Sequence, residues 1–167
     1  VHAATITVDR SGGEDTATCG VGEPPCRTIP HAVWNRAQPG DTVFVEAGTY
    51  TETLTLRSNV VISGANASVT FIDGEDVRGP MVSAAGTTIN ASAVLRGFTI
   101  RRGTATNGGG VSLTGGAAPT IEDCVLSEIE ATSNGGGIYV SGSTVFTISG
   151  TDVISNTAGS DGGGLYQ

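Results

Sequence analysis

The chain has 167 residues, of which 26 are glycine, 5% are aromatic and 14% are charged, and its net charge is −8 at pH 7. This length fits one domain, and the negative charge argues against nucleic acid as a partner, because phosphates bind basic surfaces. It also disfavours anionic membranes, and no apolar run reaches the roughly 18 residues of a membrane span, so no membrane insertion is expected.

The N-terminal segment combines a strand with a cysteine-containing loop. Residues 4–10 alternate apolar and polar side chains, which predicts a strand, and Val1-His2-Ala3 resembles the end of a secretory cleavage site. Cys19 and Cys26 lie in a polar loop rich in glycine and proline, which favours a disulfide. The alternative is a metal site, for which His31 is the one further ligand nearby.

One helix is predicted, over residues 28–37. Thr28 can cap its N-terminus, and its apolar face consists of Ile29, Val33 and Trp34. The first coil of a solenoid exposes an apolar core and unpaired strand edges. We therefore interpret residues 1–41 as an N-terminal cap with Trp34 as its plug; an incidental surface helix is the alternative.

Residues 42–167 contain short strands separated by corners rich in threonine and glycine. One motif occurs three times at steps of 27 residues, as Asn107-Gly-Gly-Gly-Val111, Asn134-Gly-Gly-Gly-Ile138 and Asp161-Gly-Gly-Gly-Leu165. A period of 20 to 50 residues is typical of solenoids, and β-branched strands without heptads predict a parallel β-helix. Equivalent residues of successive coils then lie about 4.8 Å apart.

A second set of strands keeps the same step. The segments that begin at Phe98, Cys124 and Asp152 advance by 26 and then 28 residues, so we expect them to stack as well. Cys124, the third cysteine, is interpreted as a small apolar residue of the core.

The repeated corner is interpreted as structural. Side-chain amides of Asn107 and Asn134 can form a hydrogen-bonded ladder along the axis, which Asp161 ends with a charge. The glycines that follow permit a positive φ or a close backbone approach, and they begin with Gly108, Gly135 and Gly162. A phosphate-binding loop is the alternative, but it lacks the lysine and hydroxyl residues of a P-loop.

Two tyrosines align in this repeat. Tyr139 and Tyr166 occupy the position that Ser112 holds in the first copy, between residues expected to point inward, so both rings should face outward. An outward aromatic ladder could bind sugar rings. It could equally be a surface stack or a patch buried between subunits.

The N-terminal pattern resembles a known family. The pattern is ITVD…TCG…PCRTIPHAVWNRAQPGDTVFVEAGTY-x-E-x-L, and it is similar to the cap and first coil of secreted right-handed parallel β-helix proteins of the pectin-lyase-like superfamily. The glycine repeats and the Val-Ile-Ser-Asn element at 153–156 resemble the adhesin branch, such as the polymorphic outer-membrane proteins. That branch has alanine as the third motif residue and phenylalanine in place of Val153. The resemblance implies a right-handed coil and a secreted or cell-surface protein.

Charged clusters provide an enzymatic alternative. Lyases of this superfamily use a basic residue beside carboxylate-bound calcium, and the candidates here are Arg96, Arg101 and Arg102, one coil before Glu122, Asp123, Glu128 and Glu130. The spacing places Arg96 near Glu122 and Arg101 near Glu128, and simple ion pairs explain this equally well. The acidic turn of Asp73, Glu75 and Asp76 could bind calcium weakly, or it could be solvated.

The sequence therefore indicates three candidate functions. The first is a non-enzymatic structural or adhesive module without catalytic, metal or cofactor sites. Because the sequence ends at Gln167 in mid-coil, it is either a fragment or a module that self-associates end to end into filaments. The second is a carbohydrate-binding surface centred on Tyr139 and Tyr166. The third is a polysaccharide lyase or hydrolase that uses Arg101 or Arg102.

Overall fold

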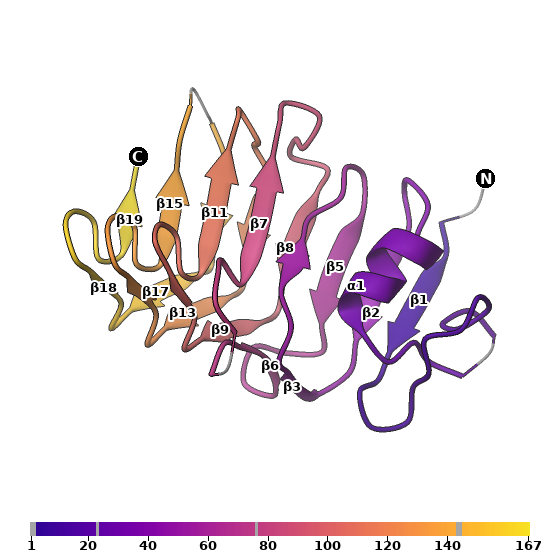
Figure 1. Cartoon of the computed structure of the whole chain (residues 1–167). Coiled ribbons are helices and arrows are strands. Elements are labelled where there is room, and N and C mark those ends of the chain that lie inside the picture. Colours follow the sequence, from indigo (N-terminus) through magenta and orange to yellow (C-terminus); the bar gives the residue numbers. More distant parts are fainter. Residues whose placement is uncertain (1–2, 23, 76, 143–144) are drawn as a thin grey trace.

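The computed structural model describes residues 3–22, 24–75, 77–142 and 145–167. Nearly all regular structure in these residues is short parallel β-strand, arranged in four sheets, with one helical segment near the N-terminus. Figure 1 shows the strands stacked in successive layers from the N-terminal to the C-terminal end. The chain is therefore an all-β protein with a solenoid-like fold.

Within the described residues, sheets A and B contain six and five strands, respectively. In order across the sheet, sheet A consists of β1 (Thr5–Val8), β2 (Thr42–Val45), β5 (Val61–Gly64), β8 (Val94–Arg96), β12 (Thr120–Glu122) and β16 (Thr147–Ser149). Sheet B consists of β3 (Gly48–Tyr50), β6 (Thr70–Asp73), β9 (Thr99–Arg101), β13 (Val125–Ser127) and β17 (Asp152–Ile154).

Sheet C also contains five described strands, whereas sheet D contains three and begins only at β10. Sheet C consists of β4 (Leu54–Thr55), β7 (Val82–Ala85), β11 (Val111–Thr114), β15 (Ile138–Val140) and β19 (Leu165–Tyr166). Sheet D consists of β10 (Thr104–Ala105), β14 (Glu130–Ala131) and β18 (Thr157–Ala158). From β8 onward the chain visits sheets A, B, D and C in this order and then returns to A.

The 27-residue step of the sequence repeat is also the step between paired residues of neighbouring strands in sheet C. Val111 pairs with Ile138, which pairs with Leu165, and each pairing is parallel. In sheet B the predicted first step of 26 residues is confirmed, because Thr99 pairs with Val125, whereas the predicted second step of 28 is wrong by one residue, because Val125 pairs with Asp152, a step of 27. A one-residue slip exchanges the two faces of a strand.

That register decides which side chains of sheet B enter the core. Ile100 and Leu126 are buried, and Val153, which follows them in register, packs against the core, whereas Ile154 is 52% exposed. The core between the sheets is built from such columns of Val, Ile and Leu side chains. Cys124 lies in it as predicted, and burial raises the pKa of its thiol to about 11.

The helical segment differs from the predicted regular helix. Thr28 caps it, accepting from the His31 N–H, but α1 (Ile29–His31) gives way to the π-helix η1 (Ala32–Arg36), which is closed by a hydrogen bond from the Ala37 N–H to the Ala32 carbonyl. The wider π-helical turn breaks the expected 3.6-residue periodicity.

The prediction that Trp34 plugs the core is wrong. Ile29 and Val33 are buried as expected, whereas Trp34 is 49% exposed and its ring lies 5.6 Å from the Arg57 guanidinium carbon. The altered turn places Ala32, rather than Trp34, inside beside Ile29 and Val33.

The predicted disulfide is present. Cys19 and Cys26 are bonded, with 2.01 Å between the sulfur atoms, and both residues are buried. Their loop pairs with the outer edge of β1, since the Thr7 N–H donates to Gly20 and the Cys26 N–H donates to the Thr7 carbonyl. The loop therefore covers the strand edge of β1 that does not face β2.

Candidate functional site

The repeated corner places its polar side chains in one row, but the ladder differs from the predicted amide stack. The Oδ1 of Asn107 accepts from the backbone N–H of Asn134 at 3.0 Å, and the Oδ1 of Asn134 accepts from the N–H of Asp161 at 3.2 Å. In return the Gly108 and Gly135 N–H groups donate to the carbonyls of Asn134 and Asp161. The side chains of Asn107 and Asn134 therefore each accept a hydrogen bond from the backbone of the next coil.

The glycines of this corner serve two purposes. Gly108, Gly135 and Gly162 have φ of 63°, 62° and 66°, the left-handed region that favours glycine. The third glycines have no positive φ, but a Cβ on Gly110 or Gly137 would lie 2.5 or 2.6 Å from a carbonyl oxygen of the next coil. The corner is thus fixed both by conformation and by backbone packing.

The tyrosines of sheet C form a stack beside this corner. Tyr139 and Tyr166 are paired in register, and their rings lie 5.6 Å apart between centroids with an angle of 5° between planes. The neighbouring Ile138 and Val140 are buried, whereas Tyr139 is half-buried. The rings therefore stack on each other on the outer side of the sheet.

A groove of about 570 Å³ lies next to this stack. Tyr139 lines it together with residues of sheets C and D and of the segment before β7, namely Arg78, Gly79, Pro80, Thr104, Ala105, Thr106, Asn107, Ser112, Thr114 and Thr132. Among these described lining residues Arg78 is the one charged side chain, and five carry a hydroxyl on an aliphatic side chain. The volume falls in the range of small-molecule sites.

Sequence reasoning found one end of this groove and missed the rest. Tyr139 and Ser112 were singled out by the repeat, whereas Arg78 lies in the connection between β6 and β7, which contains no strand of sheet D and has no repeated pattern. An isolated bridge between Arg78 and Thr104 brings that connection alongside sheet D.

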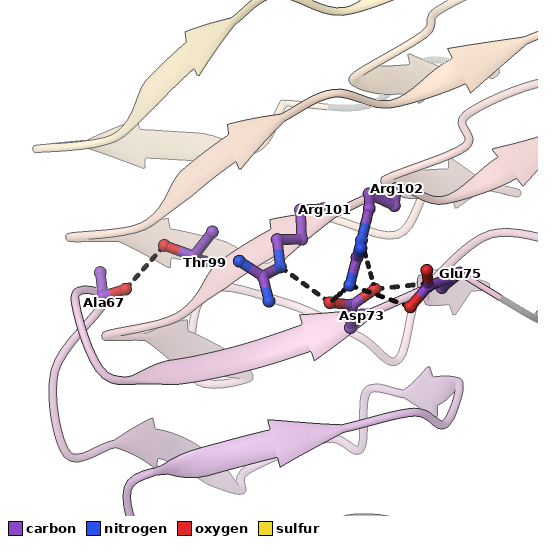
Figure 2. A network of polar contacts seen from close by, with 6 residues as sticks. All are labelled: Ala67, Asp73, Glu75, Thr99, Arg101 and Arg102. Carbon is purple, nitrogen blue, oxygen red and sulfur yellow. Dashed lines mark hydrogen bonds and ion pairs between the residues drawn. The ribbon is translucent and has the colours of Figure 1, made fainter.

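A second cluster lies on sheet B, around a fully buried carboxylate (Figure 2). Arg101 Nε donates to Asp73 Oδ2 at 2.8 Å, and Arg102 Nε donates to Asp73 Oδ1 at 2.9 Å. Arg102 Nη2 also contacts Asp73 and lies 3.3 Å from Glu75. Arg102 reaches this position from a left-handed backbone with φ of 55°, which is uncommon for a non-glycine residue.

Of the two predicted ion pairs, one is wrong and the other is present. Arg101 does not pair with Glu128, because it lies opposite Ser127 in register and points toward the preceding coil. There Asp73 accepts a hydrogen bond from Arg101, and Phe71 lies under the guanidinium. The predicted pair of Arg96 and Glu122 is present at 3.6 Å. Both arginines proposed for catalysis are therefore hydrogen-bonded to one buried acid.

The same contacts bear on the proposed calcium turn. Both carboxylate oxygens of Asp73 accept hydrogen bonds from arginines, and its Oδ1 also accepts from the Glu75 N–H. Asp76 lies outside the described residues. The carboxylate that would start the calcium loop is thus used as an internal anchor.

The pKa of Asp73 reflects two opposing effects. Burial raises the pKa of this carboxyl, but the hydrogen bonds from Arg102, Arg101 and the Glu75 N–H together outweigh burial and hold the pKa below its ordinary value of 3.8. The ionised carboxylate is therefore the form that the folded protein stabilises.

We expect this cluster to make stability fall in acid. Because the folded pKa lies below the unfolded one, the contribution of Asp73 is fully present above about pH 5 and is lost as the pH falls through the unfolded and then the folded pKa. Urea unfolding of wild type and Asp73→Asn from pH 7 to pH 2 measures it. The stability difference between the two should be constant above about pH 5 and shrink below pH 4; a difference that persists to pH 2 would contradict this assignment.

The residues of a possible metal cluster near the N-terminus already have other bonding partners. The ligand atoms of Cys19, Cys26 and His31 lie within 4.8 Å of one another, but the cysteines are joined in the disulfide. His31 Nε2 lies 3.0 Å from the Thr16 carbonyl, and its Nδ1 lies 3.0 Å from Asn35 Nδ2. The predicted disulfide, and not the metal alternative, is what the structure contains.

Comparison with known proteins adds no relative. No protein-family model matches the chain, and neither the curated proteins nor the solved structures give a match. None of the helices within the described residues has the length and apolar character needed to cross a bilayer.

Proposed function

We propose that this chain is an extracellular, non-enzymatic structural or adhesive module, a right-handed parallel β-helix with an N-terminal cap, whose flank binds carbohydrate. The cap is supported by the helical segment and by the Cys19–Cys26 loop, which hydrogen-bonds to the outer edge of β1. The disulfide also supports an oxidising, extracellular location. The repeated sequence of sheets from β8 onward supports the β-helix.

The groove beside Tyr139 is the observation that carries the carbohydrate-binding function. It combines the face of an aromatic ring with a set of hydroxyl groups and one guanidinium. Sugars present apolar C–H faces together with many hydroxyls, so a site for them needs an aromatic surface and hydrogen-bonding groups around its rim. Two smaller grooves, of about 260 and 310 Å³, have no aromatic side chain among their described lining residues.

Tyr139→Ala is expected to abolish most glycan binding. Loss of the stacking face should weaken binding by about tenfold, which corresponds to roughly 1.4 kcal/mol. Tyr166→Ala is the matched control, because Tyr166 is the other member of the stack but does not line the groove, and it should retain most of the affinity.

A glycan array probed with the three proteins, followed by titration calorimetry on the best ligand, makes the measurement. If the wild-type protein binds no glycan on a broad array, the proposed carbohydrate function is wrong. Equal affinity of wild type and Tyr139→Ala would place any binding site elsewhere on the surface.

A further inference from the structure

We infer that the groove is a slot for a single ring: the terminal residue of a glycan enters edge-on over Ser112 and stacks on the open face of Tyr139. This inference rests on the proposed carbohydrate function and names the part of the glycan that is recognised. It differs from a flat aromatic platform, on which a sugar chain would lie lengthwise along the solenoid.

The orientation of the tyrosine rings is the first step. The rings of Tyr139 and Tyr166 come from adjacent strands and are parallel within 5°. Their faces therefore look along the stacking direction of the coils, and their edges look outward. Tyr166 covers one face of Tyr139, and the other face looks toward β11, where Ser112 occupies the paired position.

The second step is the abrupt change of side-chain size along the row of residues that are paired in register with Tyr139 across sheet C. The residues that precede Tyr139 in register are all small and hydroxylated, namely Thr55, Ser83 and Ser112. Thr55 and Ser83 hydrogen-bond to each other at 3.1 Å. One strand spacing, about 4.8 Å, separates Ser112 from the tyrosine ring, so a ring lying above Ser112 would continue the stack. Both residues line the groove, whereas Tyr166 does not.

The third step is the supply of hydrogen-bonding groups around this space. The side chains of Arg78, Ser112 and Thr114 line the groove, and within the described ranges none of them has a hydrogen-bond or ion-pair partner. Asn107 uses its Oδ1 for the corner ladder, which leaves its amide NH₂ to face a ligand. These groups can donate to and accept from the hydroxyls on the edge of a sugar ring.

The shape of the slot selects a chain end. Residues of sheet C, of sheet D and of the segment that contains Arg78 line the groove, and the slot takes sheet C as its floor and the other two as its sides. A ring that enters edge-on places its inner edge against the floor, so further sugars can be attached at the outer edge alone. A residue in the interior of a 1,4-linked chain carries bonds at two opposite ring positions, so at least one neighbouring sugar would be directed against the floor or the sides proposed for the slot.

Two measurements test the slot. On an array, the wild-type protein should bind glycans that display the preferred sugar at their terminus and should lose at least tenfold in affinity when one further sugar caps that terminus. Ser112→Tyr should extend the tyrosine stack into the slot and reduce binding at least tenfold. Ser127→Tyr is the control, since Ser127 is half-buried on sheet B and does not line the groove.

The outcomes separate this inference from the proposed function. Binding of terminal but not capped glycans, with loss in Ser112→Tyr and retention in Ser127→Tyr, would support the slot. Equal binding of capped and uncapped glycans, a measurement that needs no variant, would overturn it and leave the carbohydrate function standing. Absence of all glycan binding by the wild type would overturn both.

Discussion

Asp73→Asn should lower the free energy of unfolding by about 2–4 kcal/mol at pH 7. The substitution keeps the shape of the side chain but removes the charge that faces two guanidinium groups. Breaking a buried ion pair costs roughly 3–5 kcal/mol. The arginine side chains are 30% and 38% exposed, so water solvates them in part and the expected loss is about 1 kcal/mol smaller than that range.

Glu75→Gln is the matched control for this prediction. Glu75 contacts Arg102 at 3.3 Å, but its side chain is 64% exposed, and exposed pairs contribute about 0–1 kcal/mol. Urea denaturation at pH 7, followed by circular dichroism, measures both variants. A loss below about 1 kcal/mol in Asp73→Asn would show that the buried carboxylate is not an anchor between the coils.

Gly137→Ala should destabilise the protein by about 3 kcal/mol or more. The new methyl group would lie 2.6 Å from the Gly164 carbonyl oxygen and 2.9 Å from atoms of Asn156 and Val153. The carbonyl belongs to the backbone of the next coil, which cannot move without breaking the hydrogen bond from the Ile138 N–H to that same oxygen.

Gly164→Ala separates this collision from the general cost of changing a glycine. Gly164 is the third glycine of its own motif copy, but its added methyl group would come no closer than 3.6 Å to Val153. Thermal unfolding should therefore show a large drop in the melting temperature of Gly137→Ala and a small change in Gly164→Ala. Equal effects of the two substitutions would contradict close packing between coils at this glycine.

The periodic part of the chain was predictable because equivalent residues recur in the sequence at a fixed spacing. Val111, Ile138 and Leu165 recur every 27 residues, and the structure pairs them in that register. In sheet B the prediction slipped by one residue at Asp152. Apolar residues occur at both 153 and 154, so the pattern there does not decide which one faces the core.

The parts that lie outside the repeat were predicted less well. Trp34 was placed in the core from a 3.6-residue periodicity, which the π-helical turn does not follow. Asp73 was interpreted as part of a loop, whereas it ends β6 and is fully buried. Its partners Arg101 and Arg102 are 28 and 29 residues away, and pairing across coils cannot be read from a segment that precedes the regular repeat.

In the candidate site, too, the residues of the repeat were predicted better than those outside it. The repeat predicts that Tyr139 and Tyr166 align and face outward, but it does not predict that their rings stack on each other. The groove also depends on Arg78 and Pro80, which enter from a connection without periodicity. End-to-end self-association, a secreted location and a polysaccharide lyase or hydrolase activity stay predictions.

Nuclear magnetic resonance of the tyrosine rings tests the central claim most directly. The chain contains three tyrosines, and Tyr50 is buried in the core, so it serves as an internal reference. On titration with a glycan that binds on the array, the ring signals of Tyr139 should shift most, those of Tyr166 less, and those of Tyr50 not at all. Glycan binding that leaves the Tyr139 signals unchanged would contradict a carbohydrate site at this groove.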